Sequence, residues 1–231
     1  MKTTLICISL IFFFSGCATQ GVSTKDYRAP EEIKVKNEIT IDKSYNEVWD
    51  KLVKKLSKSF YVINNINKES RIINISYFTN NPKKYIDCGE TIRTYKEGND
   101  EFIYNYDTSE NSKFLYAEEK QINSNFTYYF EIRRKTELEG RSNIYIAPVE
   151  NDKNKTNVSV NSRYILSIKT SGRSLAKNLN GIIIDQKPIP SETYTIALNT
   201  NQVGTSDEEG LTQIRCYSRG TLENEILNMA K

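Results

Sequence analysis

Side chains that commonly carry out chemistry are few in this chain of 231 residues, which has four cysteines and no histidine. The absence of histidine excludes Ser-His-Asp and Cys-His catalysis and every metal site that uses imidazole. The carboxylates of Asp87, Glu90 and Glu131 are available as acids or bases, but no spacing distinguishes them from solvated surface carboxylates. We therefore predict that the protein is not an enzyme and holds neither a metal nor a cofactor.

Cys17 lies directly after an apolar segment at the N-terminus. Lys2 precedes about ten apolar residues, 5–14, and this segment is too short for a membrane-spanning helix, which needs roughly 20. The sequence Phe14-Ser15-Gly16-Cys17 then resembles the lipobox of bacterial lipoproteins, with Phe14 where that family usually has leucine. The alternative is an ordinary signal peptide followed by an incidental cysteine.

The lipobox resemblance implies a modification and a compartment. Residues 1–16 would be a signal peptide, and Cys17 would carry a diacylglyceryl group and an acyl chain such as palmitate, which together hold a protein stably on a membrane. The next residue is Ala18, not the aspartate that often retains such proteins in the inner membrane. The resemblance therefore implies the cell outer membrane, with the folded domain in the periplasm. The polar residues 17–36 are predicted to be a flexible tether.

Cys88 and Cys216 remain once Cys7 has left with the signal peptide and Cys17 is lipidated. In an oxidising periplasm, two remaining thiols favour one disulfide bond. The alternatives are two buried free thiols or one reactive thiol. A metal site is not favoured, because two cysteines without histidine or a nearby cysteine cannot complete a tetrahedral ligand set.

The charge pattern argues against nucleic acid as a partner. The chain has 32 basic and 29 acidic residues, interspersed along its length. Binding to phosphates needs a concentrated basic surface, which this pattern does not supply. Removal of the signal peptide leaves about 215 residues, enough for one moderately large domain. We predict a single domain over residues 37–231.

The clearest predicted element is a helix at about residues 45–58. Ser44 and Glu47 form the S-x-x-E pattern of a capping box. Behind it, apolar residues recur at helical spacing on one face: Tyr45, Val48, Trp49, Leu52, Val53 and Leu56. The only tryptophan of the chain lies on this face, so we expect it in the core and not stacked on a ligand.

Most of the remaining chain has the pattern of short antiparallel strands. Residues 61–66 and 71–78 predict a hairpin, and residues 90–170 alternate apolar and polar residues between turn signals. Residues 171–192, with two prolines, predict a long loop that carries at most one short apolar strand or a helical turn. A C-terminal helix is predicted with Thr221 as its N-cap. The predicted fold class is α+β: an antiparallel β-sheet meander with the helix at about 45–58 and a short C-terminal helix packed on it.

The segment from Ser44 to Phe78 resembles a module of BamC-like envelope lipoproteins. The residues that carry the resemblance are Tyr45-Asn46-Glu47-Val48-Trp49-Asp50-Lys51-Leu52 and the apolar hairpin that starts at Phe60. The resemblance covers about a quarter of the chain after the signal peptide and implies a helix packed on a sheet.

These features predict a lipid-anchored, non-catalytic envelope lipoprotein that docks on, or supports, an outer-membrane assembly or secretion complex. Its expected partners are the membrane, through lipid on Cys17, and envelope proteins. One alternative is a periplasmic carrier that binds an apolar ligand in a helix-grip-like pocket. A further alternative is an envelope hydrolase, whose carboxylates would have to converge in one cleft.

Overall fold

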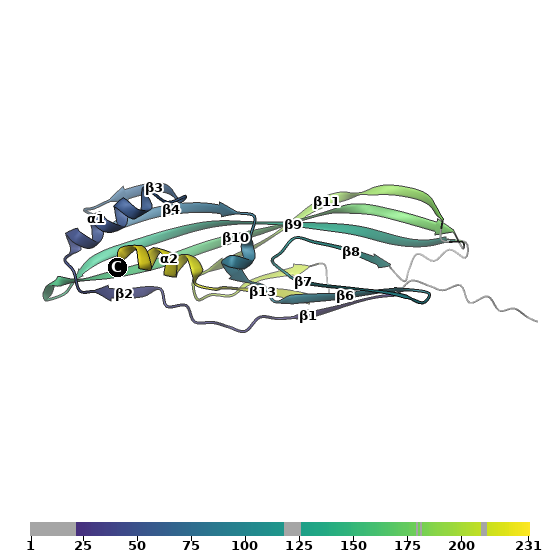
Figure 1. Cartoon of the computed structure of the whole chain (residues 1–231), viewed down its shortest axis with the longest axis horizontal. Helices are drawn as coiled ribbons and strands as arrows, with labels where there is room; N and C mark the ends of the chain where they lie inside the picture. The colour runs from purple at the N-terminus through teal and green to yellow at the C-terminus, as the bar shows by residue number, and fades with distance from the viewer. Residues whose placement is uncertain (1–21, 118–125, 179, 181, 209–211) are drawn as a thin grey trace, which may run out of the picture.

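Two long antiparallel strands define the long axis of the molecule. The computed structural model describes residues 22–117, 126–178, 180, 182–208 and 212–231. β9 (Phe126–Val149) and β10 (Asp152–Asn178) pair with each other from one end of the elongated molecule to the other (Figure 1). At roughly 3.3 Å per residue, β10 alone spans about 85 Å.

The other elements are shorter and lie along this ribbon. In chain order they are β1 (Val22–Arg28), β2 (Glu38–Ile41), α1 (Tyr45–Leu56), β3 (Val62–Asn67), β4 (Ile72–Thr79), the 3-10 helix η1 (Pro82–Lys84), β5 (Ile86–Asp87), β6 (Glu90–Glu97), β7 (Asp100–Asp107), β8 (Ser112–Ala117), β11 (Ile183–Asn199), β12 (Gly204–Glu208), β13 (Thr212–Ser218) and α2 (Thr221–Ala230). No helix within these described ranges has the length and apolar character needed to cross a membrane.

The long strands lie at the centre of a seven-stranded sheet. Along the edge that does not pair with the other long strand, each of them pairs with two shorter strands, one after the other. β9 pairs with β8 over its first part and with β4 over its last part. β10 pairs with β2 near its start and with β11 over the rest of its length. β3 extends the sheet beyond β4, so the strand order is β11-β10-β9-β4-β3.

Alternation along the strands gives this sheet an inner and an outer face in the half that carries the helices. On β9, Ile144 and Ile146 are fully buried, whereas Asn143 and Tyr145 are exposed. Successive strand residues point to opposite faces, so one register places the apolar set inside and the polar set outside.

The two helices cover the inner face of this half of the sheet (Figure 1). Ser44 and Glu47 form the predicted capping box of α1. Trp49, Leu52 and Leu56 of this helix lie in one core cluster with residues of the sheet and of α2. Burial of each such side chain stabilises the fold by about 1.5–3 kcal/mol.

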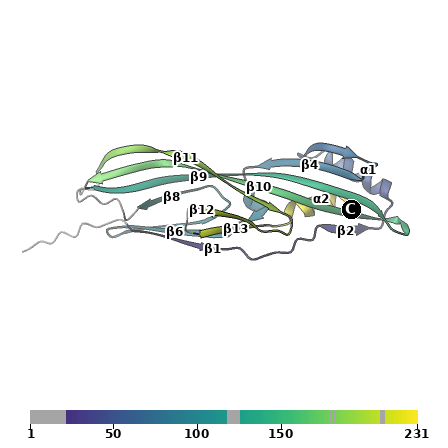
Figure 2. The same cartoon turned by 180° about the vertical axis from the view of Figure 1, so that it is seen from behind.

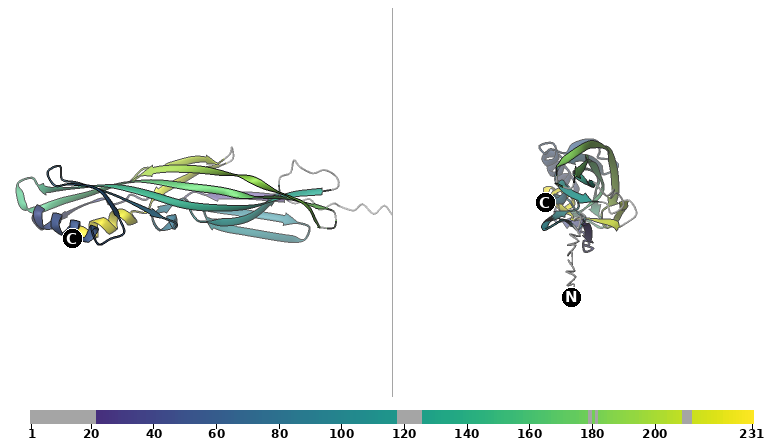
Figure 3. Two further views of the ribbon diagram at one scale, coloured as in Figure 1. Left: turned by 90° about the horizontal axis from the view of Figure 1, so that it is seen from above. Right: turned by 90° about the vertical axis from the view of Figure 1, so that its right-hand side faces the viewer.

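The other half of the molecule is two layers of strands. A three-stranded sheet, β1-β6-β7, lies against the half of the long ribbon that α1 and α2 do not cover (Figure 2). β12 and β13 lie between this three-stranded sheet and the helical half (Figure 2). A second, smaller cluster of Tyr95, Ala117, Tyr129 and Leu175 fills the space between these layers. Seen from above, the molecule is long and narrow (Figure 3).

The predicted α+β class is confirmed, but the described strands form three sheets and not the single meander that was predicted. The helix predicted at 45–58 is α1, the hairpin is β3–β4, and Trp49 is buried. The C-terminal helix is α2, but its N-cap is Gly220 and not Thr221. The Thr221 hydroxyl instead donates a hydrogen bond to the carbonyl of Lys84.

The prediction of a long loop over residues 171–192 is wrong. β10 continues to Asn178, and β11 begins at Ile183. The two prolines that suggested a loop lie in β11, at the edge of the sheet, where a residue without an N–H costs little. Gly172 is required at its position, because a Cβ there would lie 2.2 Å from the carbonyl oxygen of Glu131.

The prediction of a flexible tether over residues 17–36 is also wrong in part. Val22–Arg28 forms β1, which pairs along its whole length with β6. The side chain of Tyr27 fixes this strand, since its hydroxyl donates to the carbonyl of Cys88 and accepts from the backbone N–H of Arg215. Cys17 and the predicted signal peptide, 1–16, lie outside the described residues.

Candidate functional site

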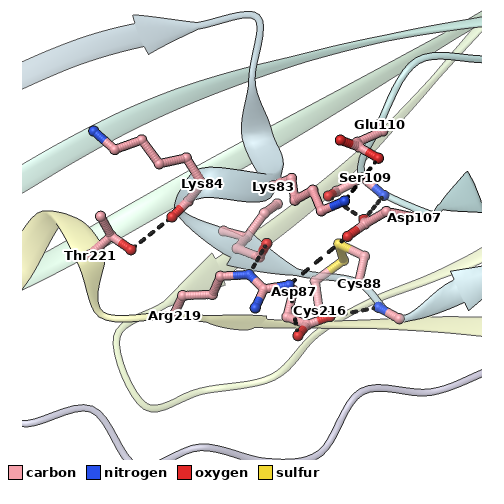
Figure 4. Close-up of polar contacts among 12 residues, drawn as sticks. Lys83, Lys84, Asp87, Cys88, Asp107, Ser109, Glu110, Cys216, Arg219 and Thr221 are labelled. Carbon is pink, nitrogen blue, oxygen red and sulfur yellow. Dashed lines mark hydrogen bonds and ion pairs between the residues drawn. A yellow bond between two sulfur atoms is a disulfide. The ribbon is translucent and has the colours of Figure 1, made fainter.

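Cys88 and Cys216 form a disulfide bond (Figure 4). Cys88 follows β5 directly, and Cys216 lies in β13. Their chain neighbours, Asp87 and Tyr217, are cross-strand partners in the β5–β13 pairing. Both cysteines are fully buried. Neither is a free or reactive thiol, so the predicted disulfide is confirmed and the two alternatives are wrong.

Arg219 closes the polar side of this junction. Its guanidinium lies 2.9 Å from the carboxylate of Asp87 and 3.9 Å from that of Asp107, and its Nε donates to the carbonyl of Ile86 (Figure 4). Gly89 adopts a left-handed backbone, with φ of +72°, and a Cβ there would lie 2.1 Å from the carbonyl oxygen of Arg28. These contacts hold β1, β5, β7 and β13 together, so we assign the junction a structural role.

The three carboxylates considered for a hydrolase lie in different settings. Asp87 pairs with Arg219, and Glu90 is exposed at the start of β6. Glu131 is 6% exposed on β9 and forms ion pairs with Lys113 and Arg173. The hydrogen bond from Lys113, followed by that from Arg173, lowers the pKa of Glu131. A general acid needs a raised pKa, so this pairing favours a structural role for Glu131.

Sequence reasoning missed a buried carboxylate on α2. Glu223 is fully buried, and its oxygens accept hydrogen bonds from the hydroxyl groups of Tyr164, at 2.8 Å, and Thr200, at 2.7 Å. Burial, and next the neighbouring carboxylate, raise the pKa of Tyr164. The sequence pattern of α2 did not indicate that Glu223 is buried. Glu223 lies in the first turn of the helix, where a glutamate is usually solvated.

The space that a helix-grip pocket would occupy contains packed side chains. Val48, Leu52 and Leu56 of α1 and Leu222 and Ile226 of α2 are all fully buried in the main core cluster. No observation therefore favours an apolar ligand carrier.

A row of asparagines crosses the outer face of the sheet, on the side away from the helices. Asn65, Asn74, Asn143 and Asn161 are direct cross-strand partners on β3, β4, β9 and β10, and we call them the asparagine row. The amide of Asn74 donates to that of Asn143 at 2.6 Å. Asn37, before β2, extends the row by donating to Asn161 at 3.0 Å.

The asparagine row lines a hollow of about 350 Å³ together with Asn67, Ser70, Ile72, Ile144 and Tyr145. This volume is within the range of small-ligand sites, which starts at roughly 300 Å³. No charged side chain is among these lining residues. In the sequence, the alternation of apolar and polar residues indicates only that these asparagines lie on a polar face of their strands. The cross-strand register that aligns them could not be predicted from the sequence.

Large apolar side chains are exposed in both halves of the molecule. In the helical half, Phe60, between α1 and β3, is completely exposed, and Val62 is 59% exposed. At the opposite end, 48–59% of Ile182, Ile183 and Ile184 is exposed where β10 turns into β11.

No protein-family model, curated protein or solved structure matches this chain. Its function must therefore be inferred from its own residues.

Proposed function

We propose that the chain is a lipid-anchored, non-catalytic envelope protein. Lipid on Cys17 holds one end at the outer membrane, and the helical half docks on an envelope partner such as an outer-membrane assembly or secretion complex. The observation that carries the proposal is an elongated fold whose first strand, β1, follows the lipobox-like sequence by a few residues and begins at the end opposite to α1 and β3, which flank the exposed Phe60 (Figure 1).

The short connection to Cys17 supports anchoring at one end. Val22, the first residue of β1, follows Cys17 by five positions. Five residues span at most about 18 Å, so a lipid on Cys17 would keep the start of β1 close to the bilayer. β1 begins at the same end of the molecule as the β10–β11 turn (Figure 1), and the exposed Ile182, Ile183 and Ile184 near that turn suit the boundary between the headgroups and the acyl chains of a membrane.

The exposed residues of the helical half support docking there. Phe60 projects fully into solvent, and Val62 begins β3, an edge strand of the long sheet. Aromatic residues are enriched where proteins bind one another, and an edge strand offers unpaired backbone groups to a partner. A docking surface here stands away from the membrane, where a large envelope complex has room to bind.

Photocross-linking in the cells that produce the protein tests this proposal. A benzophenone amino acid in place of Phe60 should form an adduct with a defined envelope protein, and the same residue in place of Phe102, near the other end, should not. The adduct should disappear in the Cys17→Ala variant, because that protein is no longer held at the membrane. Equal adducts at both positions, or no adduct at Phe60, would contradict the proposal.

A further inference from the structure

The alignment of the asparagine row needs an explanation beyond composition. Asparagine is disfavoured in strands, yet four adjacent strands each place one at the same level of the sheet. Neighbouring strands lie roughly 4.8 Å apart, so the row extends about 14 Å across the sheet. This is the length of a short oligosaccharide.

The row has hydrogen-bonding capacity that the fold does not use. A side-chain amide offers two N–H donors and a carbonyl acceptor. The side chain of Asn65 and the amide nitrogens of Asn143 and Asn161 make no hydrogen bond to other described residues. Sugar hydroxyl groups both donate and accept hydrogen bonds, as these amides do.

An apolar strip lies beside the amides. Ile72 and Tyr145 are direct cross-strand partners, each two residues away from Asn74 on β4 and Asn143 on β9, on the same outer face. Both are partly exposed, and the Tyr145 side chain is 45% exposed. A pyranose ring has an apolar C–H face and a rim of hydroxyl groups, which match a tyrosine ring next to a row of amides.

The residues that line the hollow are uncharged, in a chain in which 26% of residues are charged. The paired Arg141 and Arg163 lie two residues away from Asn143 and Asn161 and are not among the lining residues. The lining therefore favours a neutral ligand. The row crosses β4, β9 and β10, which lie inside the sheet, and it reaches an open edge only at Asn65 on β3. Strand addition needs an open edge, so a peptide strand added to β3 would lie beside the row and not across it.

We propose that the asparagine row and Tyr145 form a binding site for a neutral carbohydrate chain. The amides bind the hydroxyl groups, and Tyr145 stacks against one sugar ring. The site does not depend on the lipid anchor or on docking through Phe60, so each of these proposals can fail alone. The glycan could come from the cell's own wall or from outside the cell.

Titration of the isotope-labelled full-length protein, in a detergent without a sugar headgroup, tests the site by NMR. The probes are the tetramers of N-acetylglucosamine and of glucose, which represent the two sources. At least one should shift the side-chain N–H signals of Asn65, Asn143 and Asn161. Asn143→Ala should weaken binding about tenfold, which corresponds to the loss of roughly 1.4 kcal/mol. Tyr145→Ala should weaken it without removing any amide.

Asn105→Ala is the matched control, because Asn105 is an exposed strand residue of β7 outside the hollow. It should bind like the unmodified protein. If Asn143→Ala fails to fold, Tyr145→Ala and the amide shifts still decide the outcome. Two results would overturn the proposal: no shift with either tetramer, or equal weakening by Asn105→Ala.

Discussion

The Tyr164 hydroxyl donates a 2.8 Å hydrogen bond to the carboxylate of Glu223, joining the long strand β10 to α2 inside the core. Both side chains are fully buried, and the hydroxyl of Thr200 binds the other carboxylate oxygen. Loss of Glu223 therefore removes the acceptor of the buried Tyr164 hydroxyl and one acceptor of the half-buried Thr200 hydroxyl, which also lies 3.3 Å from the carbonyl oxygen of Ser162. α2 is attached to the sheet by this polar contact as well as by its apolar face.

We predict that Glu223→Ala lowers the free energy of unfolding by about 2–4 kcal/mol and Tyr164→Phe by about 2 kcal/mol. Urea denaturation measures both. Tyr145→Phe, at an exposed tyrosine, is the control and should change the free energy by less than about 0.5 kcal/mol. If Glu223→Ala were as stable as the control, the carboxylate would not hold α2 in place.

The disulfide should contribute strongly to stability because it closes a loop between residues 128 positions apart. On the chain-entropy model, replacement of both Cys88 and Cys216 by alanine lowers the free energy of unfolding by about 5 kcal/mol. Alkylation of the denatured, non-reduced protein followed by mass spectrometry should leave both residues unlabelled, because unfolding exposes any free thiol but does not break the bond. Labelling of both before reduction would contradict the bond.

Gly140 provides the space for the ring of Tyr77. A Cβ at Gly140 would lie 1.7 Å from the Tyr77 ring. Gly140→Ala should therefore cost about 1–3 kcal/mol through overpacking, measured by denaturation. Tyr77→Leu in the same chain should recover part of this loss, because the smaller side chain leaves the space free. Additive effects of the two substitutions would show that the contact is not the cause.

Acid should remove the stability contributed by Glu131. Its pKa in the folded protein is lowered, chiefly by Lys113, so the unfolded chain takes up the proton at higher pH. The contribution is complete above the ordinary glutamate pKa of about 4.3 and is lost as pH falls through the lower folded value. The stability difference between the unmodified protein and Glu131→Gln should therefore shrink between neutral and acidic pH. A constant difference would contradict the assignment.

Local signals in the sequence predicted the local structure well. The capping box at Ser44 and the apolar spacing behind it define α1 because both depend only on residues within one or two turns. The disulfide was also predictable, once the compartment was inferred from the residues around Cys17. The hairpin β3–β4 follows from two alternating segments and the turn between them.

The long strands were not predictable because distant partners decide them. Charged Arg134 interrupts the alternation of β9, yet it is buried where its guanidinium donates to the carbonyl of Thr108 and lies over the ring of Tyr106. The prolines of β11 are tolerated only because that strand is at an edge. The asparagine row likewise depends on register across four strands, which no single segment encodes.

Metabolic labelling with an alkyne analogue of palmitate tests lipid anchoring, the central claim, most directly. Cells that produce the unmodified protein should yield labelled protein in the outer-membrane fraction, with the label on the peptide that begins at Cys17. Cys17→Ala should carry no label and leave that fraction. Unlabelled native protein, or equal labelling of Cys17→Ala, would contradict lipid anchoring at Cys17.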